Sequence, residues 1–194
     1  SGDNNLVQPI YEMGVVGVFT KELDQALLQK EVDICVHSMK DVPTQLPDGI
    51  VEGFVPKRGP AGDVFVFREK NWESLPQRTI ATSSLRRQAQ WLFAHKNDTV
   101  VPLRGNIQTR LDKIQINNWD GAVFAQAGLQ RLSISPATYS PNGWMIPEPA
   151  QGAILVTDRE DDPKLLKKIK PLSHQSSYDC VQIERAFLRA LQGG

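Results

Sequence analysis

The chain has 194 residues, of which 40% are hydrophobic and 23% charged, and its formal net charge is zero. This length and composition indicate a globular protein of one or two small domains, and zero net charge gives no general attraction to nucleic acid or membranes. With no apolar run near the roughly 18 residues of a membrane span and a start too polar for a signal peptide, the chain is expected to be soluble and cytoplasmic.

Two cysteines occur, Cys35 in an expected strand and Cys180 in an expected helix. Neither lies in a spacing that binds metal, so no metal site is expected. Both are expected to be buried or half-buried thiols in a reducing compartment.

The first expected elements are a helix over residues 18–30 and a strand that opens the stretch VDICVHSMKDVPTQLP, residues 32–47. Apolar and polar residues alternate in VDICVH, which predicts a strand, and we expect it to be buried. The two prolines of the stretch then stop regular structure. Lys40 and Asp41 therefore lie together just past the carboxyl end of a strand, which is where open α/β sheets bind ligands.

Three strand-to-helix units follow, with strands expected at residues 79–81, 100–103 and 122–125. The hydroxyl residues of TSS, 82–84, and Asn106 are expected to cap the first two helices. Strands that alternate with helices predict a parallel, right-handed sheet whose strand-to-helix turns emerge at one edge. Arginines near these turns are Arg86, Arg87, Arg104, Arg110 and Arg131.

Surface arginines are ordinarily only solvated, but these recur at three similar turns. The start of a helix presents unpaired backbone N–H groups, and arginine adds planar donors for carboxylate or phosphate. The repeated arrangement therefore favours a polyanionic ligand.

Two stretches rich in proline and glycine, residues 57–63 and 145–152, are expected to be hinges. They predict an α/β fold of two periplasmic-binding-protein-like lobes with a cleft between them. The first lobe would be discontinuous, over residues 1–58 and 151–194, and the second would span 63–147. In the first lobe the sequence also predicts a strand at 153–156, a helix at 163–170, and a last helix capped by Ser177. The apolar face of that last helix consists of Ile183, Ala186, Phe187, Ala190 and Leu191.

Six segments, in order and at similar spacing, resemble the porphobilinogen deaminase (hydroxymethylbilane synthase) family. They are VHSMKDVPTQLPDG (36–49), ATSSLRRQAQ (81–90), LRGNIQTRLDK (103–113), AQAGLQRL (125–132), AQGA (150–153) and ERAFLRALQGG (184–194). The resemblance implies an enzyme, a transferase of tetrapyrrole biosynthesis, that joins four porphobilinogen molecules head to tail with release of ammonia. It also implies a dipyrromethane cofactor linked to a cysteine, and a monomer that needs neither nucleic acid nor membrane.

The resemblance implies roles for individual residues. Asp41 matches the catalytic carboxylate, which helps protonate the leaving amine, stabilises the positive charge on the pyrrole as the azafulvene forms, and helps remove the proton lost after coupling. Cofactor-binding positions are matched by Lys40, Thr82, Ser84, Arg86, Arg87, Arg104 and Gly105. Substrate-binding positions are matched by Arg104, Arg110, Arg131 and Gln151.

The chain departs from the family pattern in three places. Glu12 and Val16 stand where lysines are common, so some carboxylate contacts are expected to differ. The family's first strand and helix and its third domain have no counterpart, so the first lobe is expected to be incomplete. The cofactor cysteine follows the family's Gly-Gly, where this chain ends, and neither Cys35 nor Cys180 fits that role. The polypeptide as written is therefore expected not to carry the covalent cofactor.

Other interpretations of these residues remain open. A two-lobed domain that binds or senses small anions would explain the hinges and the arginines but gives no reason for Asp41. A fragment without activity is a further alternative. Asp41 on its own would ordinarily be a turn residue, and His37 is expected to form a structural hydrogen bond.

Overall fold

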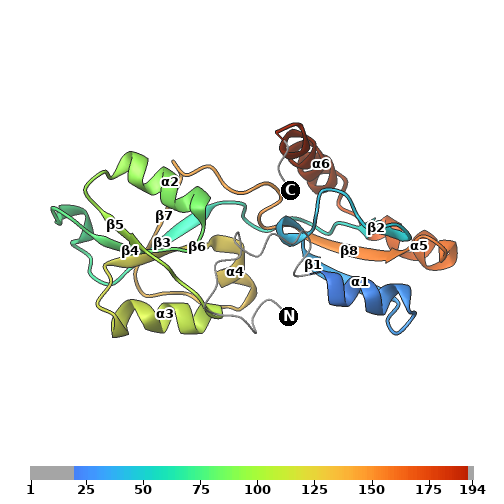
Figure 1. The fold of residues 1–194 in the computed structure, drawn as a ribbon, viewed down its shortest axis with the longest axis horizontal. Helices are drawn as coiled ribbons and strands as arrows, with labels where there is room; N and C mark the ends of the chain where they lie inside the picture. Colours follow the sequence, from blue (N-terminus) through green and yellow to red (C-terminus); the bar gives the residue numbers. More distant parts are fainter. Residues whose placement is uncertain (1–19, 192–194) are drawn as a thin grey trace. The chain divides into compact units, whose positions relative to one another are not determined.

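A computed structural model describes residues 20–191, so Glu12, Val16 and the terminal glycines lie outside the described residues. These residues form two compact units (Figure 1). Unit 1 contains residues 20–61 and 148–191, and unit 2 contains residues 62–147. Both units combine helices with a sheet, so the predicted α/β class with two lobes is confirmed. Among residues 20–191, no helix is long and apolar enough to cross a membrane.

Unit 1 is built on a three-stranded sheet of order β1-β8-β2, in which both outer strands run antiparallel to β8. Its strands are β1 (Ile34–Ser38), β2 (Ile50–Phe54) and β8 (Ile154–Arg159). Its helices are α1 (Lys21–Leu28), α5 (Pro163–Ile169) and α6 (Gln175–Ala190), with short 3-10 turns η3 (Met39–Asp41) and η5 (Lys170–Leu172). The central strand β8 therefore begins 116 residues along the chain from the end of its neighbour β1, since Ser38 pairs with Ile154.

Strand β1 forms where it was predicted, but its burial is the reverse of what its apolar residues suggest. Cys35 and His37 are buried, whereas Val36 is 59% exposed. The Cys35 thiol donates to the carbonyl of Leu23, and burial raises the pKa of that thiol. His37 Nε2 lies 3.3 Å from the Thr157 hydroxyl, which confirms a structural hydrogen bond.

Unit 2 is built on a five-stranded sheet of order β5-β4-β6-β3-β7. Its strands are β3 (Asp63–Phe67), β4 (Thr79–Ala81), β5 (Thr99–Val101), β6 (Gly121–Ala125) and β7 (Tyr139–Pro141). Its helices are α2 (Leu85–Ala94), α3 (Ile107–Ile116) and α4 (Gln126–Arg131), with a 3-10 turn η4 (Trp72–Ser74). The three predicted strand-to-helix units are parallel to one another, but β3 runs antiparallel to β6 and to β7. The predicted parallel arrangement of the three units is therefore correct, and the sheet also contains β3, which runs opposite to its neighbours and was not part of that prediction.

Helices α2 and α3 lie on opposite faces of this sheet (Figure 1). Trp91 of α2 packs on Phe65, with ring centroids 4.7 Å apart. Ile114 of α3 packs in a second cluster with Val64 and Val66, the neighbours of Phe65 along β3. Alternate residues of β3 therefore face the two helices, as expected for a strand buried on both sides.

Helix α6 differs from its prediction in two ways. His174, not Ser177, is the N-cap, because its side chain accepts from the Ser177 N–H. The predicted apolar face is turned to solvent, with Ile183, Phe187 and Leu191 exposed, while Val181 and Arg185 are buried. Cys180, on the same helix, is also exposed. The expectation of a buried or half-buried thiol is therefore wrong for this cysteine.

Candidate functional site

The Lys40–Asp41 pair lies in η3, directly after the last residue of β1, as the sequence predicts. Lys40 Nζ lies 3.8 Å from Asp41 Oδ1 and 3.5 Å from Glu148 Oε2. One ammonium group therefore lies near two carboxylates of unit 1. The positive charge of Lys40 is therefore divided between Asp41 and Glu148.

The environment of Asp41 raises its pKa above the ordinary value. Burial raises the pKa of Asp41, Lys40 lowers it, Glu148 raises it again and a hydrogen bond with Ser38 lowers it, with a net rise. The Asp41 side chain is still 41% exposed, so water screens part of this effect. A carboxyl group whose pKa lies above its ordinary value is better suited to hold and release a proton near neutral pH.

The turn that carries Asp41 is fixed by its neighbours. Met39 is fully buried, and its N–H donates to the carbonyl of Ala153 at 3.0 Å. The Val42 N–H closes the turn on the Met39 carbonyl. The predicted site residue thus lies between two anchored residues.

In unit 2, Arg86 and Arg87 share one buried partner, Asp63. Arg86 Nη2 lies 2.8 Å from Asp63 Oδ2, and Arg87 Nη2 lies 2.7 Å from Asp63 Oδ1. Arg86 also donates to the carbonyl of Ile146, and Arg87 to that of Val123. Burial alone would raise the pKa of Asp63, but Arg87 and Arg86 outweigh it and hold that pKa below its ordinary value.

The hydroxyl residues before α2 act as the sequence predicts, as caps. Ser84 is the N-cap and its side chain accepts from the Arg87 N–H. The buried Thr82 accepts from the Ser84 N–H at 3.2 Å. Asn106 caps α3 in the same way by accepting from the Thr109 N–H. The starts of α2 and α3 follow the parallel strands β4 and β5, so both lie at one edge of the sheet.

Arg104, Gly105 and Arg110 gather at the start of α3. The Arg110 Nε donates to the Gly105 carbonyl at 2.6 Å, and Gly105 has a φ of +111°, which favours glycine. Arg104 is half-buried in the turn before the helix. Arg131 does not join this group through its helix start, because it is the last residue of α4, about 8 Å along the helix axis from its first residue.

Gln151 is fully buried in unit 1, where its side-chain amide donates to the carbonyl of Ala61. Arg58 Nε donates to the Gln151 carbonyl, and the Arg58 guanidinium pairs with Glu184 through two hydrogen bonds. Glu184 also accepts from the Ala150 N–H. In this structure Gln151 is part of a network that joins residues 58–61 to 150–151, and its contact with a substrate stays a prediction.

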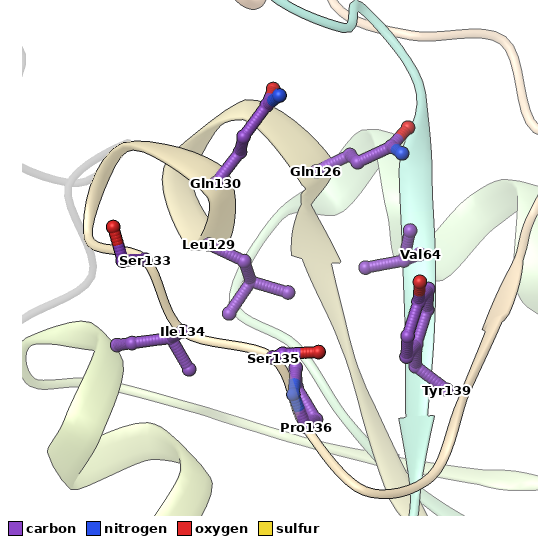
Figure 2. A pocket seen from close by; sticks show the side chains of 9 residues that line it. All are labelled: Val64, Gln126, Leu129, Gln130, Ser133, Ile134, Ser135, Pro136 and Tyr139. Atoms are coloured by element: carbon purple, nitrogen blue, oxygen red, sulfur yellow. The ribbon is translucent and has the colours of Figure 1, made fainter.

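A pocket of about 360 Å³ opens in unit 2 between α4, β3 and the segment after α4 (Figure 2). It is lined by Val64, Leu129, Ile134, Pro136 and Tyr139 and by the uncharged polar residues Gln126, Gln130, Ser133 and Ser135. None of the residues that line it is charged. This pocket therefore does not suit a polycarboxylate, unlike the arginines at the starts of α2 and α3.

Sequence reasoning missed two acidic residues of these groups. Asp63 and Glu148 both lie in the proline- and glycine-rich stretches that were interpreted only as hinges. A carboxylate beside an arginine-rich segment is a signal for an ion pair, but which arginine it meets depends on the strand pairing. Asp63 opens β3, which pairs with β6, and this brings it to the N-terminal turn of α2.

Comparison with known proteins identifies the family. A family model described as "Porphobilinogen deaminase, dipyromethane cofactor binding domain" matches residues 1–167. Relatives named porphobilinogen deaminase from Desulforudis audaxviator and Pelotomaculum thermopropionicum are 43% and 45% identical over the whole chain, which spans 64% and 63% of their lengths. XAC2383 from Xanthomonas citri bound to ATP is a similar solved structure, with a TM-score of 0.50 at 10% identity over 89% of this chain and 83% of that one. This last likeness concerns the fold alone. From the match of the family model over residues 1–167, the chain belongs to the porphobilinogen deaminase family.

Proposed function

We propose that this chain supplies the catalytic carboxylate and the carboxylate-binding groups of a porphobilinogen deaminase. Such an enzyme is a transferase that joins four porphobilinogen molecules into hydroxymethylbilane and releases ammonia at each step. The observation that carries the proposal is the Lys40–Asp41 pair, fixed in a turn at the end of β1 in a chain of this family.

Asp41 is the proton-transferring group in this proposal. Burial raises the pKa of Asp41, and when protonated this carboxyl gives a proton to the leaving amine. Once ionised, the same carboxylate stabilises positive charge on the pyrrole and accepts the proton lost after coupling. Lys40, which also lies near Glu148, would bind a carboxylate of the cofactor without fully neutralising Asp41.

The dipyrromethane cofactor implied by the family is a polycarboxylate, and unit 2 offers donors for such a group, of which Arg86 and Arg87 already bind Asp63. Arginine guanidinium groups and the N-terminal N–H groups of α2 and α3 are donors suited to carboxylates. The residues that would hold it are Lys40, Thr82, Ser84, Arg86, Arg87, Arg104 and Gly105. When bound, the cofactor supplies the pyrrole chain to which the first substrate is joined. Arg104, Arg110, Arg131 and Gln151 are proposed to contact substrate carboxylates.

Further properties expected from the sequence are part of the same proposal. They are hinges at 57–63 and 145–152, lobes over 1–58 with 151–194 and over 63–147, a monomeric state and a cytoplasmic location. The carboxylate of Asp41 beside Lys40, in a chain of this family, supports an enzyme over a domain that only binds anions, because binding alone requires the cations and not this carboxyl group.

The test is to express the protein from its complete gene and to follow porphobilinogen and ammonia. An enzyme consumes porphobilinogen and releases one ammonia for each molecule consumed. Replacing Arg104 by Gln should raise KM, since a carboxylate contact is lost, whereas the same change at the exposed Lys164 of α5 should not. Binding of porphobilinogen without release of ammonia would contradict the proposal.

A further inference from the structure

Arg185 of α6 is buried beneath the turn that carries Asp41. Only 3% of the residue is exposed. Its Nη1 donates to the carbonyls of Met39 and Val42 at 3.3 and 3.0 Å, and its Nη2 donates to the carbonyl of Pro43 at 2.5 Å. The three carbonyls lie on both sides of Asp41 in the sequence, so one side chain joins the two ends of the turn.

This guanidinium is a buried charge that binds main-chain carbonyls. Burial lowers the pKa of Arg185, Glu52 raises it and Arg189 lowers it. Within residues 20–191, no carboxylate forms an ion pair with Arg185, whose hydrogen bonds go to main-chain carbonyls. A buried charge is often replaced by an apolar side chain without loss of stability, whereas a planar guanidinium can bind several carbonyls in a fixed geometry.

We propose that Arg185 is a positioning residue for Asp41, because its three hydrogen bonds fix residues 39–43 and so fix the direction of the Asp41 carboxylate beside Lys40. This inference rests on the proposed function. Arg185 acts through the backbone of the turn and does not itself contact the substrate. A carboxylate displaced by about 1 Å can lose a hundredfold in rate without loss of binding.

Arg189 provides a matched control one helical turn later. It also donates to a carbonyl, that of Thr44 at 3.3 Å, but it is exposed and its partner lies beyond the turn. Replacing Arg185 by Lys keeps the positive charge but removes the planar guanidinium with its two donor nitrogens, whereas replacing it by Met removes both the charge and the guanidinium. Replacing Arg189 by Met makes the same chemical change outside the turn.

The experiment measures kcat, KM and the titration of Asp41 by carbon-13 NMR in the protein expressed from its complete gene. For R185K and R185M, we expect kcat to fall about 10- to 100-fold with KM within about threefold, and for R189M we expect both within about twofold. The titration midpoint of Asp41 should move in both Arg185 variants, although Ser38, Lys40 and Glu148 are unchanged. Amide spectra of β8 show whether each variant is folded. If R185M does not fold, the comparison is made with R185K alone.

The outcomes separate this inference from the function on which it rests. If the wild-type protein turns over porphobilinogen and folded R185K keeps both kcat and the Asp41 midpoint, the positioning role is wrong and the function stands. If kcat of an Arg185 variant falls only in proportion to the fraction of protein that is unfolded, the positioning role of Arg185 is also wrong. If the wild-type protein shows no turnover, the proposed function fails, and an unchanged Asp41 midpoint in R185K would then overturn the inference independently.

Discussion

Replacing Asp63 by Asn should destabilise unit 2 strongly. The Asp63 side chain is fully buried and binds both Arg86 and Arg87, so its loss leaves two cations without their common partner. Removing one member of a buried ion pair costs about 3 to 5 kcal/mol. Arg86 is 21% exposed and water compensates part of its charge, so we expect the lower end, about 3 kcal/mol. With an m-value of about 1.5 kcal/mol/M, the urea midpoint falls by about 2 M.

Tryptophan fluorescence is a selective assay for this change, because Trp72, Trp91, Trp119 and Trp144, the four tryptophans of the chain, all lie in unit 2. Replacing the exposed Asp112 of α3 by Asn is the control and should shift the midpoint little. Since the pKa of Asp63 is lowered in the folded state, its contribution is present above the unfolded value of about 3.9 and is lost as the pH falls through the folded value. The difference between wild type and variant should therefore shrink in acid. A loss below about 1 kcal/mol at pH 7, or a gap that does not shrink, would refute the reasoning.

Two further changes test unit 1. Replacing Glu148 by Gln should lower the pKa of Asp41, because a negative charge that raises it is removed and Lys40 is released toward Asp41. Carbon-13 NMR of Asp41 measures this pKa, and replacing the exposed Glu160 by Gln is the control. An unchanged or raised pKa of Asp41 in the Glu148 variant would contradict the geometry. Replacing Gly152 by Ala should destabilise unit 1 by about 2 kcal/mol, since its φ is +83° and a Cβ would lie 2.6 Å from the Pro60 carbonyl oxygen. Hydrogen exchange of β8 amides measures that loss of stability. Replacing Gly143 by Ala is the comparison in unit 2, because a Cβ there meets nothing within 4 Å, and tryptophan fluorescence measures its effect. Equal losses of stability in the two variants would show the strain argument to be wrong.

The local elements were largely predictable because their signals are local. Ser84 and Asn106 cap helices by accepting from N–H groups three residues later, and such contacts depend on a few neighbouring residues. The turn after β1 follows from the two prolines of its stretch. The parallel arrangement of β4, β5 and β6 follows from alternation with helices.

Burial and long-range pairing were less predictable, because they depend on what packs against each face. The alternation in β1 gives a strand but does not say which face is covered, and in the structure Cys35 and His37 are inside while Val36 is outside. The sequence predicts the apolar face of α6 but not what covers it, and in the structure that face is exposed while Arg185 is buried and binds carbonyls of the 39–43 turn. The partners of the arginines were missed for the same reason, since Asp63 meets them only after β3 pairs with β6.

The most direct test of the catalytic role is to replace Asp41 by Asn in the protein expressed from its complete gene and to compare turnover and ligand content with wild type. The exposed Asp48, a few residues later, is the control for the same change. We expect D41N to keep its dipyrromethane cofactor and to lose turnover by about a hundredfold or more, while D48N keeps both the cofactor and the turnover. Turnover by D41N within a few fold of wild type would contradict the assignment of Asp41 as the catalytic carboxylate.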